Sequence, residues 1–462
     1  MFKKVLIANR GEIACRVIRT CKRLGIKTVA VYSEADAGAP HVKQADESVL
    51  IGPPQVKDSY LKIDAIVEAA KSTGADAIHP GYGLLSEKRS FAEAVAAAGI
   101  KFIGPTPETL DAFGDKIKAR AVARAAGVSP PPGSDGPIAT DDMDTVRSIA
   151  EKVGFPLLVK AAGGGGGIGM QVVQKIEDLE KAVKTCSDRG RSAFADERVY
   201  LERYMSSPRH IEVQVICDSH GNGVALGERE CSMQRRHQKV LEESPSPATF
   251  FQGIEGEARR SKLHADALRV VKSIGYVNAG TVEFIADANG DLWFLEVNAR
   301  LQVEHPVTEM VTGVDLVELQ LLVASGEKLP EGLPTAPTGH SIEARVYAED
   351  PSKSFVPQPG KITKLVWPEA NASLRIETGV EEGSEVTPFY DPMIAKVVVH
   401  AATRAEAIAA LDTALGNTQL ELTGPRGPAA TNLTYLRKAI TDSRFSSGTY
   451  DTLVAEAIAK GK

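Results

Sequence analysis

The sequence predicts a multidomain protein of mixed α/β and α+β class, with a doubly wound parallel sheet at the start and a small α+β region at the end. Three observations support this fold class. Short apolar strands alternate with helices over about the first hundred residues, which is the pattern of a parallel sheet with helical crossovers. Proline- and glycine-rich stretches then interrupt the chain twice. Between and beyond them, strands with alternating polar and apolar residues predominate.

The first strand, 4–8, leads through Asn9-Arg10-Gly11 into a helix that ends at Gly25. The apolar stripe of this helix consists of Ile13, Val17, Cys21 and Leu24. The other predicted elements of the region are strands 28–32, 48–51, 75–79 and 101–103 and helices near 63–72 and 87–98. Because the turn NRGEIA lacks the GxGxxG fingerprint, a nicotinamide-binding site is not favoured.

The segment His79-Pro80-Gly81-Tyr82-Gly83 follows a strand end, where doubly wound sheets place ligand-facing loops. A buried turn histidine at position 79 fits the same pattern equally well.

Two connections divide the chain. The segment Gly104 to about Lys116 is punctuated by proline and glycine, and a second linker spans 328–339 with three prolines. We therefore expect a Rossmann-like domain over 1–113, a central domain over 114–330 and a C-terminal domain over 331–462. Strands 341–347, 361–367, 374–377 and 394–400 and a helix near 404–415 indicate that the last is a small α+β domain.

Five consecutive glycines, 163–167, lie between predicted strands 155–161 and 171–173. Without Cβ atoms, such a run lets backbone N–H groups wrap a polyphosphate. No Gly-Lys-Ser/Thr follows, so the run is not a P-loop. It indicates either a lid that closes over a nucleotide, with Lys160 facing phosphate, or a plain surface turn.

The stretch from Gly280 to Pro306 is predicted to form two strands joined by a type I′ turn at Asn289-Gly290. That register places Thr281 opposite Asn298, Ile285 opposite Phe294, and Glu283 opposite Glu296. Like charges directly across a ladder destabilise it, so we expect a divalent cation between the two carboxylates. Oxygen ligands suit Mg²⁺ or Mn²⁺. The alternative is a hairpin whose acidic residues face water.

The period of two in this hairpin predicts two faces. The polar face continues beyond the strand and comprises Glu296, Asn298, Arg300, Gln302 and Glu304. The core face comprises Val282, Phe284, Trp293, Leu295 and Val297. The segment Arg229–Lys239 is dense in cations, and it is either a solvated basic loop or part of an anion site.

Composition narrows the classes of partner. The 462 residues carry a net charge of −6, with a pI near 5.9, which argues against a nucleic-acid surface. No apolar run approaches a membrane span, and no secretory leader is recognisable. Five scattered cysteines without CxxC spacing suit reduced thiols in a cytoplasm. We expect no nucleic acid and no membrane among the partners.

Ten stretches together resemble biotin carboxylase along nearly the whole chain. They are IANRGEIA (7–14), HPGYG (79–83), SEKRSFAE (86–93), GDK (114–116), VKAAGGGGG (159–167), PRHIEVQV (208–215), ERECSMQRRHQKVLEESP (228–245), EVNARLQVEHPVTEMVTGVDL (296–316), EARVYAEDP (343–351) and FYDPMIAKV (389–397). The resemblance implies an ATP-grasp fold for the central domain, with a glycine-rich lid at about 132–204.

The resemblance also assigns roles to individual residues. The implied ATP contacts are Lys116, Lys160, Gly165, Gly166, Glu202, Arg203, Tyr204, Met205, His210, Gln234 and His237. The implied metal ligands are Glu283, Glu296 and Asn298, holding two Mg²⁺ or Mn²⁺ ions. The implied bicarbonate contacts are Lys239, Arg300, Gln302 and Val303. Glu304 is implied as the general base and Arg345 as the cation that stabilises the biotin enolate, so the catalytic set is Lys239, Arg300, Glu304 and Arg345.

The activity implied is ATP-dependent carboxylation of biotin by bicarbonate through carboxyphosphate. Because no biotinyl Ala-Met-Lys-Met motif or carboxyltransferase region is present, biotin is expected on a separate carrier protein and the carboxyltransferase on another chain. The family suggests a homodimer. The final acyl acceptor is left open. Where the family often has a basic lid residue, this chain has Ile168, so the implied lid contacts come from glycine backbone.

Two other functions fit parts of the pattern. One is an ATP-grasp ligase that forms an acyl phosphate and joins it to an amine, which would need no equivalent of Arg345 and Lys239. The other is a non-catalytic assembly subunit, which would have lost the charged site residues that this chain retains.

Overall fold

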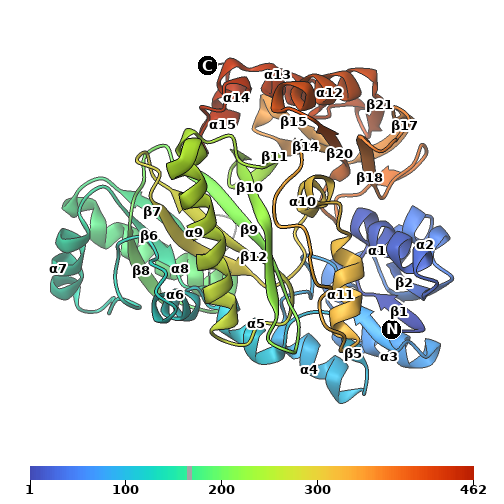
Figure 1. The fold of residues 1–462 in the computed structure, drawn as a ribbon, viewed down its shortest axis with the longest axis horizontal. Helices are drawn as coiled ribbons and strands as arrows, with labels where there is room; N and C mark the ends of the chain where they lie inside the picture. The colour runs from blue at the N-terminus through green and yellow to red at the C-terminus, as the bar shows by residue number, and fades with distance from the viewer. Residues whose placement is uncertain (164–168, 462) are drawn as a thin grey trace.

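The computed structural model describes residues 1–163 and 169–461. It confirms the predicted fold class. A parallel sheet forms the N-terminal region, two antiparallel sheets form the centre, and a mixed region of strands and helices covers the far end (Figure 1). Within the described residues, no helix combines the length and apolarity needed to span a bilayer. The five cysteines are all buried and unpaired.

The N-terminal sheet has five parallel strands in the order β3-β2-β1-β4-β5. Its strands are β1 (Lys4–Ile7), β2 (Lys27–Ser33), β3 (Glu47–Gly52), β4 (Ala77–His79) and β5 (Lys101–Phe102). Its helices are α1 (Gly11–Arg23), α2 (Pro40–Gln44), α3 (Ile63–Thr73), α4 (Arg89–Ala97) and α5 (Pro107–Gly114). The stripe of α1 packs into the core as expected, with Ile13, Val17 and Cys21 buried.

Helices α5 and α10 (His305–Thr312) lie in segments for which the sequence analysis predicted no helix. The segment 104–116, predicted as a connection, contains α5, whose Thr106 side chain caps the helix by accepting a hydrogen bond from Thr109 N. The second helix, α10, lies in the segment after the hairpin. Both have proline in the first turn, where its missing N–H costs nothing. Proline punctuation therefore marked helix starts rather than irregular chain.

The lid is a separate small layer at the left of Figure 1. It has a three-stranded antiparallel sheet, ordered β7-β6-β8, and its own apolar core. Its elements, with the preceding α6, are α6 (Lys116–Ala125), α7 (Met143–Val153), β6 (Leu157–Ala161), β7 (Met170–Val173), α8 (Leu179–Phe194) and β8 (Val199–Arg203). The two strands predicted to flank the glycine run are β6 and β7.

An eight-stranded antiparallel sheet, ordered β13-β12-β9-β10-β11-β14-β20-β18, is the largest element. Its strands are β9 (Arg209–Cys217), β10 (Gly223–Arg235), β11 (Gln238–Ser244), β12 (Asn278–Ala286), β13 (Leu292–Asn298), β14 (His340–Tyr347), β18 (Leu374–Thr378) and β20 (Met393–Ala401). Helices α9 (Gly253–Lys272) and α11 (Leu316–Ala324) accompany it. Strands β14, β20 and β18 follow the 328–339 linker, so this one sheet continues across the predicted boundary at residue 330.

The C-terminal region adds a four-stranded sheet, ordered β19-β17-β21-β22, and a two-stranded pair, β15 and β16. These strands are β15 (Glu349–Asp350), β16 (Val356–Pro357), β17 (Gly360–Val366), β19 (Glu385–Val386), β21 (Gln419–Gly424) and β22 (Gly427–Ala429). The helices are α12 (Arg404–Asn417), α13 (Leu433–Thr441), α14 (Ser443–Ser446) and α15 (Val454–Ala459).

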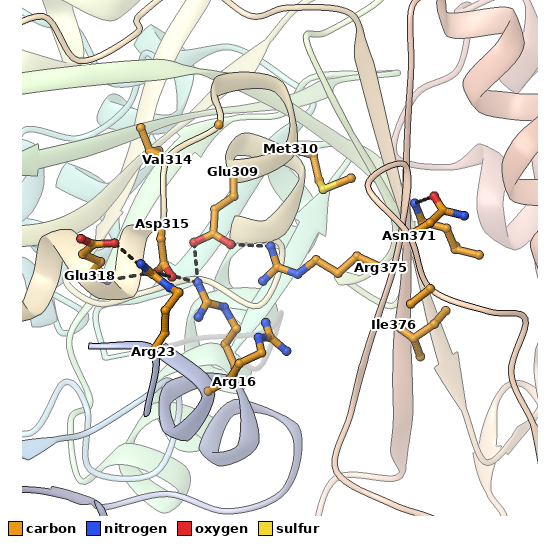
Figure 2. Close-up of a pocket in the computed structure, with 14 residues that line it drawn as sticks. Arg16, Arg23, Glu309, Met310, Val314, Asp315, Glu318, Asn371, Arg375 and Ile376 are labelled. Atoms are coloured by element: carbon orange, nitrogen blue, oxygen red, sulfur yellow. Dashed lines mark hydrogen bonds and ion pairs between the residues drawn. The ribbon is translucent and has the colours of Figure 1, made fainter. Parts of the chain in front are cut away.

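Buried ion pairs join α1, α10 and β18 where the N-terminal and C-terminal regions meet. Figure 2 shows Arg16 between Glu309 and Asp315, while Arg375 reaches Glu309 from the other side. Arg16 Nη2 lies 2.7 Å from Glu309 Oε1, and Arg375 Nη1 lies 2.7 Å from Glu309 Oε2. The cavity beside them, of about 600 Å³, is lined by none of the predicted site residues.

The hairpin of β12 and β13 has the predicted pairs at its far end but a different turn. Thr281 pairs with Asn298 and Glu283 with Glu296, as predicted. The turn is not type I′, because Gly290 has a φ of +78° and Asn289 is not in the left-handed region. Asp287 instead closes a longer loop by accepting hydrogen bonds from the backbone N of Asn289 and Asp291.

A β-bulge explains how the predicted turn is wrong while the predicted pair of Glu283 and Glu296 is correct. The longer loop shifts the register near the turn, so Ile285 pairs with Trp293 rather than with Phe294. Leu295 is then the extra residue between Phe294 and Glu296, and it restores the predicted register beyond it.

The bulge also corrects the predicted core face. Phe294 is fully buried and packs on Phe284, whereas Trp293 is half-buried. Leu295, predicted as core, lines the cavity described below. An extra residue reverses which side chains face inward.

This correction predicts that truncation of Phe294 and truncation of Trp293 lower the free energy of unfolding by different amounts. We expect Phe294→Ala to lower the free energy of unfolding by about 3–5 kcal/mol, as removal of a buried aromatic ring does. Trp293→Ala should cost less than half as much, because its ring is only half-buried. Urea unfolding of both variants measures the difference, and an equal or reversed order would restore the strict alternation.

Candidate active site

A cavity of about 580 Å³ lies where the lid, the eight-stranded sheet and the loop 299–304 meet. Every predicted site residue that the structure describes lines it: Lys116, Lys160, Glu202, Arg203, Tyr204, Met205, His210, Gln234, His237, Lys239, Glu283, Glu296, Asn298, Arg300, Gln302, Val303, Glu304 and Arg345. Gly165, Gly166 and Ile168 lie outside the described residues. Although β13 ends at Asn298, the residues predicted to follow in phase still face the same cavity.

His79 is not among these lining residues. Its ring is buried, with Nδ1 accepting from Gly81 N and Nε2 lying 3.2 Å from Gln320 Oε1. Of the two possibilities for the HPGYG segment, position 79 is therefore the buried turn histidine.

The segment Arg229–Lys239 is not a solvated loop. Arg229 is fully buried in β10, where it bonds Glu212, Gln214 and Thr308. Only Arg236 and His237 lie between β10 and β11, and both have positive φ. This strained two-residue turn presents His237 to the cavity.

Two lysines face the cavity from opposite walls, each already paired with a carboxylate. Lys160 Nζ on the lid lies 2.9 Å from Glu202 Oε1, and Lys116 Nζ lies 2.8 Å from Glu296 Oε2. Glu202 also binds Arg120. Burial would lower the pKa of Lys116, but Glu296 outweighs burial and raises it. Lys116 is therefore charged, and both lysines face the cavity, where they can meet an anionic ligand.

Apolar side chains that the sequence analysis missed line the same cavity: Leu158, Met170, Ile285, Leu295 and Leu453. Leu158 was detectable, because the period of two in β6 places it on the face of Lys160. Leu295 faces the cavity through the bulge. Leu453 comes from the C-terminal end, near where Thr452 N donates to Pro208 O, and its local sequence gives no signal of this contact.

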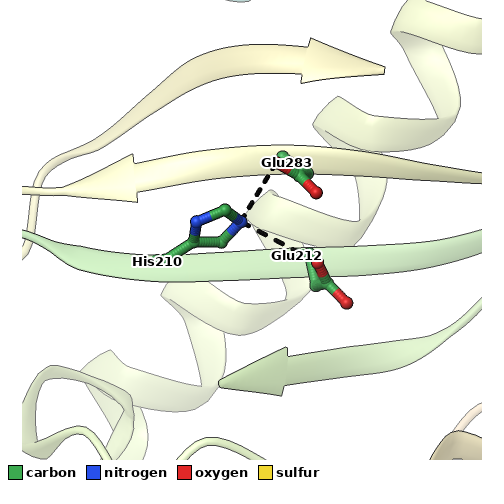
Figure 3. A group of neighbouring side chains, drawn as sticks. All are labelled: His210, Glu212 and Glu283. Atoms are coloured by element: carbon green, nitrogen blue, oxygen red, sulfur yellow. Dashed lines mark ion pairs between the residues drawn. The ribbon is translucent and has the colours of Figure 1, made fainter. Parts of the chain in front are cut away.

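The carboxylates of β9 and β12 form a second charged group. Figure 3 shows His210 directed at Glu283 and Glu212, with His210 Nε2 3.1 Å from Glu283 Oε2 and 3.8 Å from Glu212 Oε2. Their ligand atoms lie within 4.8 Å of one another. Asn298 Nδ2 donates to Glu283 Oε1. Glu212 was missed, although the alternation of its strand places it on the same face as His210.

Lys239 is the charge centre of the cavity. Its Nζ donates to carboxylates of Glu212, Glu283 and Glu304. Burial would lower the pKa of Lys239, but these three carboxylates outweigh burial and raise it well above its usual value. The same charge holds the pKa of Glu283 low, against the effect of burial.

Glu304 lies between two cations just before α10. One carboxylate oxygen accepts from Lys239, and the other lies 2.8 Å from Arg345 Nη2. Burial would raise the pKa of Glu304, but Lys239, Arg345 and Arg229 outweigh burial and keep the pKa well below the usual range. Glu304 is therefore ionised and able to accept a proton.

Arg300 is held by three side-chain acceptors and by Leu301 O, to which its Nη1 donates at 3.2 Å. Its Nε donates to Glu87 Oε2, its Nη2 to Asn298 Oδ1 and its Nη1 to Gln302 Oε1, each at 2.9 Å. Glu87 also accepts from Ala299 N. Glu87 belongs to the SEKRSFAE stretch and was missed as a site residue, because only the fold brings α4's N-terminal side to this loop.

Two further buried carboxylates, Glu242 and Glu343, pair directly across β11 and β14 behind Arg345. Glu242 Oε1 lies 2.6 Å from Arg345 Nη2. Burial is the main cause that raises the pKa of Glu242 to about 7, and it raises the pKa of Glu343 well above the usual value. Neither carboxylate oxygen of Glu343 has a hydrogen-bond partner among the described residues, so the folded protein favours the protonated form of Glu343.

Two antiparallel sheets that enclose lysines and opposed carboxylates define an ATP-grasp enzyme. The comparisons agree. Residues 115–332 match the family model of the carbamoyl-phosphate synthase L chain ATP binding domain. Residues 1–110 match the biotin carboxylase N-terminal domain, and residues 343–457 match the biotin carboxylase C-terminal domain.

Three similar proteins cover nearly the whole chain. A biotin carboxylase of Halalkalibacterium halodurans is 52% identical over 97% of this chain and 96% of its own. The structure of a biotin carboxylase–β,γ-ATP complex from Campylobacter jejuni has a TM-score of 0.92, with 45% identity and 98% of both chains covered. The biotin carboxylase domain dimer of Hydrogenobacter thermophilus 2-oxoglutarate carboxylase, with MgADP, ADP and bicarbonate, has a TM-score of 0.91, with 42% identity and 99% of both chains covered.

The chain belongs to the biotin carboxylase family. Membership confirms the predicted class of enzyme, an ATP-dependent ligase that carboxylates biotin. The comparisons give no support to the alternative amine ligase.

The raised pKa of Glu343 predicts a pH-dependent effect on stability. Its folded pKa is raised, so the unfolded chain ionises first and stability falls as pH rises above about 4.5. Glu343→Gln removes this contribution, by at most about 1.4 kcal/mol per pH unit. We therefore expect the melting temperature of Glu343→Gln to rise relative to that of the parent protein as the pH increases from 5 to 8. The exposed Glu421→Gln is the control, and parallel curves for Glu343→Gln would show that Glu343 is ionised in the folded protein.

Proposed function

We propose that the residues lining this cavity carboxylate biotin in two steps that share one site. Bicarbonate first attacks the γ-phosphate of ATP to give carboxyphosphate and ADP. Carboxyphosphate then releases CO₂ and phosphate, and biotin captures the CO₂ as carboxybiotin. The observation that carries this proposal is Glu304, ionised and held between Lys239 and Arg345 beside the opposed carboxylates of β12 and β13.

ATP is proposed to lie between the lid and the large sheet. Glu202 to Met205, on the strand and loop that end the lid, would contact the adenine, with Leu158, Leu295 and Leu453 as apolar neighbours. Lys116, Lys160 and His237 would face the phosphates, and His210 and Gln234 would complete the nucleotide contacts. Because both lysines are paired with carboxylates here, nucleotide binding would exchange those pairs for contacts with phosphate.

A divalent cation fits the carboxylates of Glu283 and Glu296. They face each other across the ladder, and carboxylate oxygens are ligands that suit these cations. The amide oxygen of Asn298 now accepts from Arg300 and its Nδ2 donates to Glu283, so Asn298 would exchange these contacts to add an amide oxygen to the set. Glu283, Glu296 and Asn298 would hold Mg²⁺ or Mn²⁺, two ions in all, and the bound metal would neutralise charge on the phosphates. His210 Nε2 lies 3.1 Å from Glu283 Oε2, close enough to orient that carboxylate.

Bicarbonate is proposed to bind between Lys239, Arg300, Gln302 and the backbone of Val303. Glu304 would accept the bicarbonate proton and leave a carbonate dianion to attack phosphorus. A base with a depressed pKa is weak. Binding of anionic bicarbonate would draw Lys239 away from Glu304. The pKa of Glu304 would then rise as the substrate binds.

Biotin is proposed to approach Arg345. Phosphate released from carboxyphosphate would take the N1′ proton, and the ureido nitrogen would then attack CO₂. Arg345 would stabilise the negative charge on the ureido oxygen. Its guanidinium now contacts Glu304 and Glu242, so a turn away from Glu304 would both free the base and present a donor to biotin.

The assembly is proposed from the family. Relatives are subunits or domains of biotin-dependent carboxylases, and dimers of the domain occur. We infer a homodimer that acts on biotin attached to a separate carrier protein, with a carboxyltransferase on another chain. Five unpaired, buried cysteines support a cytoplasmic location. The domain boundaries at 113/114 and 330/331 belong to the same proposal.

One assay separates this function from other ATP-grasp ligases. ATP hydrolysis is measured with bicarbonate and free biotin, each present or absent, and we expect the full rate only with both. Hydrolysis that ignores biotin, or that requires an added amine, would contradict the proposal.

Arg345→Ala tests the biotin step alone. We expect nucleotide affinity, measured by direct binding, to stay within about twofold, while biotin-dependent turnover falls about 10²- to 10³-fold, as for loss of one oxyanion donor. Arg404→Ala is a matched control, because it also removes a guanidinium from an ion pair with a buried glutamate, Glu243, but away from the cavity. Normal turnover in Arg345→Ala would remove Arg345 from the mechanism.

A further inference from the structure

Lys396 is a fully buried lysine outside the predicted site set. It lies on β20, directly opposite Arg345 on β14, so the two side chains share one face of the sheet. Unlike Arg345, it does not line the cavity. Its Nζ donates to Val303 O at 2.8 Å and lies 3.0 Å from Glu12 Oε1.

Val303 O belongs to the peptide between Val303 and Glu304. Its neighbour on the other side is also fixed, because Gln302 O accepts from Nδ1 of the buried His305 at 2.7 Å. In a trans peptide the N–H and C=O point in opposite directions, so the Val303 N–H is directed away from His305. Among the described residues, this N–H has no acceptor. It is therefore free for a ligand in the cavity.

Glu12 links Lys396 to the N-terminal region. It lies in the first turn of α1 and is buried, and its second carboxylate oxygen accepts from Tyr82 Oη at 2.6 Å. The loop of Tyr82 is fixed in turn, since Asn9 Nδ2 donates to the carbonyls of Pro80 and Tyr82. Three segments far apart in sequence thus hold one peptide of the loop 299–304.

We propose that Lys396 is a positioning residue that, with Glu12, fixes the Val303–Glu304 peptide for bicarbonate, an inference that rests on the proposed function. A buried ion pair adds little net stability, so its main effect is on geometry. Lys396 holds the carbonyl of Val303. This carbonyl lies between the Val303 N–H, the proposed bicarbonate donor, and Glu304, the proposed base. Lys396 and Glu12 are expected to affect the binding of bicarbonate alone, because none of their contacts reaches the lid or the residues proposed for ATP.

The test compares kinetics with direct binding. We expect Lys396→Met to raise KM for bicarbonate about 10- to 100-fold, the effect of losing a charge-assisted hydrogen bond. The dissociation constant of ATP, measured without bicarbonate, should change less than twofold. Because Lys396→Met leaves Glu12 buried without its cation, Lys396→Met with Glu12→Gln is made as well. We expect this double variant to melt closer to the parent protein and to keep the high KM for bicarbonate.

Two further variants separate positioning from general damage. Lys396→Arg keeps the charge, and we expect its KM for bicarbonate to fall between those of the parent and Lys396→Met. Arg10→Met breaks a different contact between the N-terminal and C-terminal regions, in which Arg10 pairs with Asp36 and stacks on Tyr390. It should lower the melting temperature and leave KM for bicarbonate unchanged.

An unchanged KM for bicarbonate in folded Lys396→Met, or in the double variant with Glu12→Gln, would overturn the positioning role. So would an equal loss of ATP and bicarbonate affinity, which indicates general disruption. If the parent protein itself shows no bicarbonate-dependent ATP hydrolysis, the proposed function fails, and that result is distinct from a failure of the Lys396 variants.

Discussion

The structure depends on the balance of charge around Lys239. Three buried carboxylates, from Glu212, Glu283 and Glu304, approach this one ammonium group, and each would be costly to bury without it. They come from β9, from β12 and from the segment before α10, so the charge balance ties the hairpin of β12 and β13 to the loop 299–304. Arg345 and Arg229 complete the balance from β14 and β10. An anion that enters the cavity competes for these cations, which is how substrate binding can release the base.

Much of this site could be predicted, because strand periodicity and motif order are local properties of the sequence. The pairing of Glu283 with Glu296 was correct although the turn beside it was wrong. The hairpin loop is longer than Asn289-Gly290 suggested, and the bulge at Leu295 offsets the resulting shift. No pattern in the sequence marks that bulge, so Trp293 and Leu295 were placed in the core while Phe294 occupies it.

The residues that were missed are those whose role comes from tertiary contact. Glu87 reaches Arg300 across 213 positions, and Lys396 reaches Val303 across 93. Glu242 and Glu343 become neighbours only when β11 and β14 pair. Glu212 is the exception, since its alternation with His210 was visible and its carboxylate was overlooked. The helix α5 was missed because the prolines of the segment 104–116 were interpreted as a connection, whereas Pro107 is a first-turn residue.

The continuity of the eight-stranded sheet has a mechanical consequence. The carboxylates proposed for the metal are on β12 and β13, the bicarbonate lysine is on β11, and Arg345 is on β14, all in one hydrogen-bonded array. The lid has its own sheet and its own apolar core. A movement of the lid would therefore shift Lys160 without altering the spacing between the residues proposed for the metal, for bicarbonate and for biotin. The eight-stranded sheet therefore sets the distance between the proposed bicarbonate and biotin sites, and the position of the lid does not change that distance.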